Sequence, residues 1–259
     1  MISKNQFKFI RQLEQKKFRR REGLFVAEGT KVVGDLLQRY QPHSVYATAE
    51  WIKNNPTTEA TEVSDDELRR LSFQQHPQQV LALFPLPQGP KGVTPETVAN
   101  LRSFTTKGMQ EGLSLALDGI QDPGNLGTII RIADWFGIST IYCSDDTVDA
   151  YNPKVVQATM GSIARVNIIY TDLTALLKSL PQDFPVYGTF LDGENIYTQE
   201  LSNHGLIIMG NEGNGISGEV RALVNRRLLI PNFHNGDTVD SLNVAIATAI
   251  TCSEFRRRQ

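Results

Sequence analysis

Short apolar segments alternate with longer amphipathic ones from residue 113 onward, and this alternation constrains the fold more than any other feature. The segments predicted to be strands lie at residues 113–117, 140–143, 166–170, 186–190, 206–209 and 228–230. Helical spacing of apolar residues predicts helices at about 126–136, 153–163, 173–180, 217–225 and 242–257. Strands that alternate with helices form a parallel sheet covered on both faces. We therefore predict an α/β fold for this half of the chain.

The first 85 residues predict a second, smaller α/β unit. We expect a helix over about 3–20, strands at 24–28, 44–47 and 80–84, and helices that begin near residues 30 and 65. A stretch rich in proline and glycine follows at 85–92, and such residues end regular structure. The predicted organisation is a domain over 1–85, a linker over 86–111 and a domain over 112–259.

Composition excludes several classes of protein. Of the 259 residues, 40% are hydrophobic, yet none of the apolar runs approaches the ~18 residues that a membrane helix needs. The first residues lack the apolar stretch of a signal peptide. Cys143 and Cys252 lie far apart in apolar segments, outside any Cys-x-x-Cys or Cys/His cluster. We expect a cytoplasmic protein with two buried free thiols and no metal site.

The net charge of -2 hides a basic N-terminus. Glu14 is the only acidic residue before residue 22. The same stretch contains the basic residues Lys4, Lys8, Arg11, Lys16, Lys17, Arg19, Arg20 and Arg21. Such a run is either a solvated face or a surface that binds phosphates, because clustered cations gain by releasing counterions from a polyanion.

Polar residues follow three of the predicted strands. These segments read Asp-Pro-Gly-Asn-Leu-Gly-Thr-Ile-Ile-Arg at 122–131, Gly-Asn-Glu-Gly-Asn-Gly at 210–215 and Ser-Leu-Asn-Val-Ala-Ile-Ala at 241–247. An open α/β sheet binds its ligand at the carboxyl ends of its strands. We therefore expect one shared site.

The glycine-rich segment has three interpretations. Residues 213–218 match the dinucleotide-binding pattern Gly-x-Gly-x-x-Gly, which would indicate an oxidoreductase. Glu212 argues against it, because a pyrophosphate would meet a negative charge, and the next strand does not end in an acidic residue. The other two interpretations are a tight turn and a loop that contacts a nucleoside-like ligand.

The flanking segments have both structural and functional interpretations. Asn125 or Thr128 can cap a helix in which Arg131 lies about one turn from the start. Arg131 is either a surface charge or an anchor for a phosphate or carboxylate. Ser241 can cap the last helix, and Asn243 in its first turn needs hydrogen-bond partners, for which a ligand is one candidate.

Taken together and in order, the three segments resemble the three motifs of the SpoU (TrmH) RNA ribose methyltransferases, within the SPOUT superfamily. The segment Leu-Phe-Val-Ala-Glu-Gly-Thr-Lys at 24–31 is similar to the substrate-binding domain of members that modify ribosomal RNA, a domain related to ribosomal protein L30e. The resemblance implies an L30e-like N-terminal domain, a C-terminal parallel sheet with a deep trefoil knot, and a homodimer formed through the C-terminal domain.

The resemblance implies transfer of a methyl group from S-adenosylmethionine to a ribose 2'-hydroxyl. The expected substrate is 23S ribosomal RNA, and transfer RNA is the second candidate. It carries over catalytic roles for Arg131, Asn125, Glu212, Ser241 and Asn243. The implied cofactor-binding residues are Thr189, Gly210, Asn211, Gly215, Ile230 and Leu242. With RNA as the substrate, we expect Lys16, Lys17, Arg19, Arg20 and Arg21 of the basic run to bind it, together with Lys31 of the segment 24–31.

The family proposal makes the arginine the general base, but an arginine side chain stays protonated in proteins. We expect Arg131 to act by charge and positioning, with a substrate phosphate as a possible proton acceptor. Two features depart from the family pattern: the segment 232–240 is longer, and Ala245 stands where serine is common. A catalytically inactive RNA-binding protein is the remaining alternative.

Overall fold

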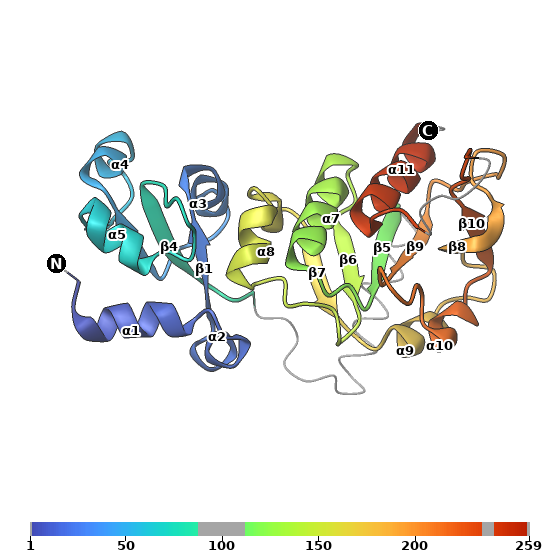
Figure 1. The fold of residues 1–259 in the computed structure, drawn as a ribbon, viewed down its shortest axis with the longest axis horizontal. Coiled ribbons are helices and arrows are strands. Elements are labelled where there is room, and N and C mark those ends of the chain that lie inside the picture. The colour runs from blue at the N-terminus through green and yellow to red at the C-terminus, as the bar shows by residue number, and fades with distance from the viewer. Residues whose placement is uncertain (1, 88–111, 235–240, 258–259) are drawn as a thin grey trace. The chain divides into compact units, whose positions relative to one another are not determined.

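The computed structural model describes residues 2–87, 112–234 and 241–257, and most of the predicted linker lies outside them. The chain forms two compact units (Figure 1). The first unit comprises residues 1–88 together with the later segment 149–165, and the second comprises 89–148 and 166–259. Each compact unit is therefore built from two stretches of chain that are separated in the sequence.

A four-stranded sheet forms the centre of the first unit, within the described residues, in the order β1-β4-β2-β3. Its strands are β1 (Leu24–Glu28), β2 (Ser44–Ala47), β3 (Thr61–Glu62) and β4 (Val80–Pro85). β4 pairs antiparallel with β1 and β2, while β3 pairs parallel with β2. Its helices are α1 (Lys4–Gln12), α2 (Lys16–Glu22), α3 (Thr30–Leu37), α4 (Ala49–Asn54) and α5 (Asp65–Leu71). Sequence patterning did not predict α4 and β3, which are short.

The core of this unit joins its helices to its strands. Ile10 and Leu13 at the end of α1 and Leu68 and Leu71 on α5 pack with buried residues of β1, β2 and β4. The predicted single helix over 3–20 is divided, because Gln15 has an extended backbone (φ -92°, ψ 131°) and α2 begins after it. The division places Arg19 on a separate, short helix.

The segment 149–165 reaches the first unit after leaving the second. It contains α8 (Pro153–Ala158), which packs against β1, and the 3-10 helix η1 (Ser162–Ala164). The Tyr151 ring lies 4.9 Å from the Phe25 ring. α8 ends earlier than predicted because Met160 and Gly161 have positive φ values, of 51° and 96°. In this region Arg165 and Lys31 both bind Asp35, at 2.9 and 3.0 Å.

A six-stranded sheet forms the second unit within the described residues, in the order β10-β8-β9-β5-β6-β7. Its strands are β5 (Leu113–Asp118), β6 (Thr140–Cys143), β7 (Asn167–Tyr170), β8 (Val186–Asn195), β9 (Gly205–Gly210) and β10 (Arg226–Leu229). All neighbouring pairs are parallel, which confirms the predicted α/β class. The chain runs outward from β5 to β7 and then returns to the other side of β5. The topological switch point, where such sheets bind ligands, thus lies between β5 and β9.

Among the described residues, the helices of the second unit are α7 (Pro123–Trp135), α9 (Leu173–Lys178), α10 (Gly218–Arg221) and α11 (Val244–Arg257). α7 and α11 lie side by side and run in the same direction, as Figure 1 shows. At their carboxyl ends, Arg256 Nε donates a hydrogen bond of 2.8 Å to the Phe136 carbonyl. The trefoil knot remains a prediction from the family resemblance.

Cys143 and Cys252 are both buried and free, as expected, and burial raises the pKa of the Cys252 thiol to about 12. Among the described helices, none has the length and apolar character needed to span a membrane.

Candidate active site

The carboxyl edge of the second sheet brings the three predicted segments together. Motif one (residues 122–131) follows β5 and begins α7, motif two (210–215) starts at the last residue of β9, and motif three (241–247) leads into the first turn of α11. β5 and β9 are neighbours over their whole length, from the pair Leu113 and Gly205 to the pair Asp118 and Gly210. The parallel register therefore delivers motifs one and two to the same point of the edge.

A chain of hydrogen bonds joins the three motifs. Asn243 Nδ2 donates to Asn125 Oδ1 at 2.9 Å, and Asn125 Nδ2 donates to Glu212 Oε1 at 2.6 Å. Each residue comes from a different motif, and the three span 118 positions of sequence. Because the Asn125 amide both accepts and donates, its orientation is fixed by its two partners. Asn125 is thus the central link between the motifs.

The caps of the two helices differ from the predicted ones. Asp122 caps α7 by accepting a hydrogen bond of 2.8 Å from the Asn125 N–H, and Pro123 occupies the first turn. α7 therefore starts earlier than predicted, and Arg131 lies about two turns from its start rather than one. In α11, Asn243 Oδ1 accepts from the Ala245 and Ile246 N–H groups, so Asn243 caps the helix in place of Ser241.

Arg131 is exposed on α7 and makes no hydrogen bond or ion pair with any described residue. Buried residues on the opposite side of the helix, including Ile129, Ile130 and Ala133, fix α7 against the sheet. The guanidinium of Arg131 is therefore held on a well-packed helix, and none of its donors is used by the described residues. Ser241 and Leu242 are also exposed, and Leu242 retains 47% of its accessible surface.

The glycine-rich segment after β9 forms a closed loop. Asn211 and Gly215 exchange backbone hydrogen bonds of 3.0 and 2.9 Å, and Gly215 has a φ of 69°. A Cβ atom on Gly210 would lie 2.3 Å from the backbone of Gly215 and Ile216, so only glycine fits there. The side chain of Asn211 is used within the protein: Oδ1 accepts from Gly213 and Asn214, and Nδ2 donates to the Gly119 carbonyl. Asn211 thus shapes the loop, whereas its predicted role was to contact the cofactor.

A buried carboxylate that sequence reasoning missed supports this loop. Asp118, at the end of β5, accepts a hydrogen bond of 2.7 Å from the Ser217 N–H and is only 8% exposed. The sequence does contain a signal for Asp118, because an acidic residue ends an otherwise apolar strand. Asp118 holds the far end of the loop next to motif one.

A second missed cluster stabilises the strand that carries Thr189. The guanidinium groups of Arg221 and Arg227 lie 4.6 and 4.8 Å from the centre of the Phe190 ring, and both bind Asp192 at 2.6 Å. Desolvation alone raises the pKa of Asp192, but the hydrogen bond from Arg227 and the charges of both arginines outweigh it and lower that pKa. Thr189 is half-buried beside this cluster, and its hydroxyl contacts the Met209 sulfur.

The residues at this edge fit a nucleoside-like cofactor. The closed loop offers backbone carbonyl groups at Glu212, Gly213 and Asn214, because the N–H groups of Gly213 and Asn214 already donate to Asn211. Ile230, which follows β10, and Leu242, which precedes α11, supply apolar surface. Among the described residues there is no group of three or more histidine, cysteine, aspartate or glutamate side chains that could hold a metal ion.

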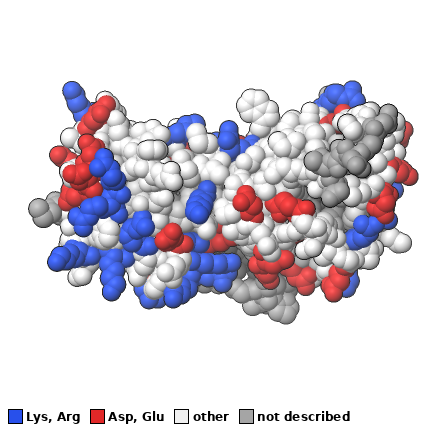
Figure 2. Space-filling model, in the orientation of Figure 1, with Lys and Arg blue, Asp and Glu red and all other residues white. Residues whose placement is uncertain are grey.

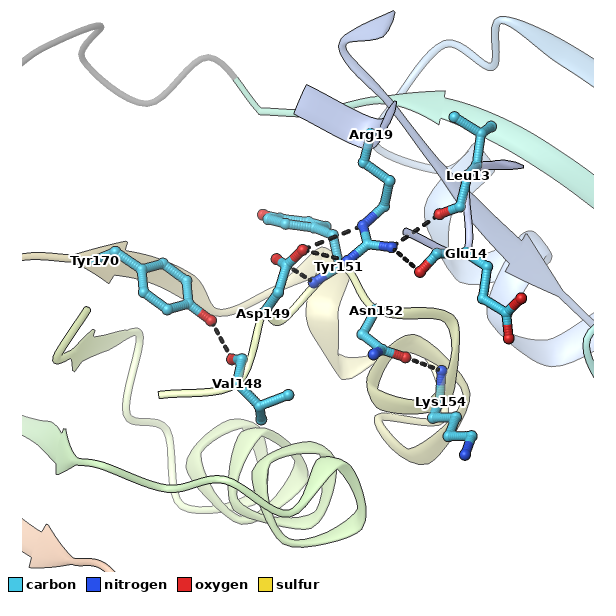
Figure 3. Close-up of polar contacts among 9 residues, drawn as sticks. All are labelled: Leu13, Glu14, Arg19, Val148, Asp149, Tyr151, Asn152, Lys154 and Tyr170. Atoms are coloured by element: carbon cyan, nitrogen blue, oxygen red, sulfur yellow. Dashed lines mark hydrogen bonds and ion pairs between the residues drawn. The ribbon is translucent and has the colours of Figure 1, made fainter. Parts of the chain in front are cut away.

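One predicted RNA-binding residue is structural. Arg19 is 2% exposed, and its guanidinium donates to Asp149 and to the carbonyls of Leu13 and Glu14, at 2.8 and 2.6 Å (Figure 3). All of its nitrogen atoms are thus occupied within the first unit. Arg19 is therefore removed from the predicted RNA surface.

The other predicted RNA-binding residues keep accessible side chains. Lys17, Arg20 and Arg21 on α2 are exposed, Lys16 is half-buried, and Lys31 pairs with Asp35 while remaining exposed. Figure 2 shows basic side chains gathered over α1 and α2.

Comparisons with known proteins agree with this geometry. The model of the SpoU rRNA Methylase family matches residues 112–253, and that of the MRM3-like substrate binding domain matches 4–82. The chain is 31% identical to the 23S rRNA (guanosine(2553)-2'-O)-methyltransferase of Bacillus subtilis over 197 residues, covering 75% of this chain and 71% of that protein.

Solved structures give the same result over the whole chain. A putative RNA methyltransferase of the TrmH family from Porphyromonas gingivalis is 42% identical, with a TM-score of 0.85 and full coverage of both chains. An AdoMet-bound rRNA methyltransferase from Sinorhizobium meliloti is 30% identical, with a TM-score of 0.83 and coverage of 100% and 96%. The protein described here therefore belongs to the SpoU rRNA methylase family and is an S-adenosylmethionine-dependent RNA methyltransferase.

Proposed function

We propose that this protein methylates a ribose 2'-hydroxyl of 23S ribosomal RNA. The hydrogen-bonded chain from Asn243 through Asn125 to Glu212 carries the proposal, because it assembles all three motifs at the switch point of the sheet. The N-terminal match to a substrate-binding domain and the 23S rRNA relative favour ribosomal over transfer RNA. Basic residues on α1 and α2 supply charge for the phosphate backbone.

S-adenosylmethionine supplies a methyl group on a sulfonium, which is already a good leaving group. The protein must hold donor and acceptor in line and manage the hydroxyl proton, and alignment alone contributes on the order of 7–11 kcal/mol in favourable cases. We assign cofactor binding to Thr189, the backbone of Gly210 and Gly215, and the side chains of Ile230 and Leu242. Thr189 directly follows the part of β8 that pairs with β9, and the other positions lie at or beyond the carboxyl ends of β9 and β10 or before α11.

Arg131 is assigned an electrostatic and positioning role. Its fork of donors is unused by the described residues, so it can grip a substrate phosphate beside the reacting ribose. The phosphate then accepts the hydroxyl proton, since the guanidinium itself stays protonated. Asn125 and Asn243 hold Glu212 in place, and exposed Ser241 lies two residues from this network.

Transfer of tritium from labelled S-adenosylmethionine to a 23S rRNA transcript tests the activity, and mapping of the modified nucleotide identifies the target. We expect Arg131→Ala to lower turnover by at least about a hundredfold, as loss of an electrostatic contact to the reacting groups does. The control is Arg226→Ala, an exposed arginine at the amino end of β10, which should retain turnover. Full activity of Arg131→Ala would refute the assigned role.

Calorimetry separates the methyltransferase from the two alternatives. S-adenosylhomocysteine should bind and NAD should not, because Glu212 is exposed at the tip of the glycine-rich loop. Binding of NAD in its place would favour the oxidoreductase. Binding of RNA without any methyl transfer would favour an inactive RNA-binding protein.

We also propose that the active form is a homodimer through the second unit. Trp135 on α7 is 85% exposed and Ile246 on the neighbouring α11 is 53% exposed, so this helix pair presents apolar surface that a second chain can cover. Sedimentation equilibrium should give twice the mass of one chain for the wild type and one chain for Trp135→Glu. Leu191→Glu, at a comparably exposed apolar residue on β8, is the control and should remain dimeric.

A further inference from the structure

The loop between α5 and β4, residues 72–79, is held at both ends by groups inside the first unit. The buried carboxylate of Glu28 accepts hydrogen bonds from the Ser72 hydroxyl and, at 2.9 Å, from the Phe73 N–H. Arg11 donates to the Ser72 carbonyl at 2.6 Å, and its guanidinium lies 4.4 Å from the centre of the Phe73 ring. The first part of the loop therefore has a fixed conformation.

The other end of the loop is fixed by the sheet. Thr48 N–H donates to the Gln79 carbonyl at 2.9 Å, and Gly29 N–H donates to the Val80 carbonyl at 2.9 Å. Gly29 has a φ of 88°, and a Cβ atom there would lie 3.1 Å from Gln78 Oε1. The turn from β1 into α3 thus leaves room for the Gln78 amide.

This loop forms one wall of a pocket of about 460 Å³. The opposite walls are Thr30 at the start of α3 and Asp65, Leu68 and Arg69 on α5. Such a volume is within the range of small-ligand sites. The amide groups of Gln78 and Gln79 line the pocket and make no side-chain hydrogen bond with any described residue.

The chemistry of the walls selects the kind of ligand. A glutamine amide presents a donor and an acceptor side by side, and the carboxylate of Asp65 accepts from exocyclic or ring N–H groups. A phosphate is disfavoured, because Asp65 would repel it and Arg69 already pairs with Asp66 at 3.0 Å. A neutral ring with donors and acceptors on its edge fits both amides and the carboxylate, while Leu68 and Pro77 provide apolar surface.

We propose that this pocket binds an unpaired nucleobase of the RNA substrate, with Gln78, Gln79 and Asp65 reading its edge. Proteins that read RNA sequence do so mainly at unpaired bases turned out of the stack. The pocket lies in the unit that matches a substrate-binding domain, and the inference rests on the proposed function of RNA methylation. The buried Glu28 then acts as a positioning residue, because it holds the loop that carries both glutamines.

Filter binding of an unmodified 23S rRNA transcript, over a series of salt concentrations, tests the proposal. Gln78→Ala, Gln79→Ala and Asp65→Asn should each weaken binding about tenfold. Their dependence on salt should equal that of the wild type, because the lost contact is to a base. Gln75→Ala is the matched control, since Gln75 is exposed on the same loop outside the pocket, and it should bind as the wild type does.

Lys17→Ala provides the contrasting behaviour, with a salt slope reduced by about one unit, as expected for a lost phosphate contact. Equal thermal midpoints establish that the pocket variants are folded, and Gln79→Glu, which keeps the shape and replaces a donor with an acceptor, repeats the test. Wild-type affinity in the pocket variants, or an equal loss in Gln75→Ala, would overturn the proposal. A reduced salt slope in the pocket variants would also overturn it, in favour of a phosphate contact.

Methyl transfer on the same transcript separates this proposal from the proposed function. If the wild type binds the transcript but does not methylate it, the proposed function fails and the affinities of the variants still decide the pocket. If the wild type does not bind the transcript, both fail. Where methylation occurs, the pocket variants should raise KM for RNA about tenfold, without changing kcat or the affinity for S-adenosylhomocysteine.

Discussion

Replacement of Arg19 by methionine should destabilise the protein much more than replacement of its neighbour Arg20. Arg19 is 2% exposed, and its removal leaves Asp149 without its cation and the carbonyls of Leu13 and Glu14 without donors. Loss of one partner from a buried ion pair costs about 3–5 kcal/mol. The Asp149 side chain is 15% exposed and can regain some hydration, so we expect the lower end, about 3 kcal/mol.

Urea unfolding measures this effect. A loss of about 3 kcal/mol corresponds to a fall of roughly 1–3 M in the midpoint for ordinary m-values. Arg20→Met, which removes an exposed arginine from the same helix, should change the free energy of unfolding by less than about 0.5 kcal/mol. It should weaken RNA binding and reduce its salt slope by about one unit.

A double-mutant cycle with Asp149→Asn identifies the cause. Asparagine keeps an oxygen for the Tyr151 N–H, which Asp149 Oδ1 accepts at 3.1 Å, and removes the charge that Arg19 neutralises. Arg19→Met should therefore cost less on this background, by about 1–3 kcal/mol. Additive losses, or equal losses for Arg19→Met and Arg20→Met, would refute the assignment of Arg19 as a buried structural cation.

Three further predictions concern the active site and the first unit. In Asn125→Asp a second carboxylate faces Glu212, and repulsion between the two raises the pKa of one of the pair. Methyl transfer by this variant should therefore increase as pH falls from 8 to 5. A flat pH profile, or one like that of the wild type, would contradict the hydrogen-bonded chain. Gly210→Ala should weaken S-adenosylhomocysteine binding on the order of tenfold, measured by calorimetry, because the added Cβ would overlap the loop backbone. Gly218→Ala is the control and should bind as the wild type does, because a Cβ there meets nothing within 4 Å. Burial is the main cause of the raised pKa of Glu28. Protonation of Glu28 therefore stabilises the folded wild type. This stabilisation is fully present below the unfolded-state pKa near 4.5 and is lost as pH rises through the higher folded-state pKa. The free energy of unfolding of the wild type minus that of Glu28→Gln, from urea titrations, should therefore fall with rising pH across this window, and a difference that rises instead would contradict the burial argument.

The sequence predicted the elements that are long or strongly patterned. Strands over 24–28, 44–47 and 140–143 have the predicted bounds, because continuous apolar runs identify buried strands. The end of α8 was missed, since a positive φ at Met160 is not visible in an apolar pattern. The predicted starts of α8 and α9 are correct, but those of α7 and α11 were misplaced, because several residues near each start can act as caps and tertiary contacts decide which one does.

The candidate site was predictable to the extent that strand ends share an edge. This rule brought Asn125, Glu212 and Asn243 together, and the structure joins them by hydrogen bonds. Charge clustering, on which the RNA-binding prediction was based, cannot distinguish an exposed arginine from a buried one within a basic run, and Arg19 was misassigned for that reason. Its partner, Asp149, lies 130 residues further along the chain, beyond the reach of local patterning.

That separation has a consequence for the order in which the protein is made. A ribosome adds about 5–20 residues per second, so Arg19 is synthesised roughly 7–26 s before its counter-ion. During this time β1 also lacks α8, which later packs against it. In the nascent chain Arg19 therefore lacks its counter-ion, and the apolar face of β1 remains uncovered until translation has passed residue 158. Folding of the first unit during translation should therefore finish only after residues 89–148 of the second unit have been synthesised, and the early chain is a client for chaperones until then.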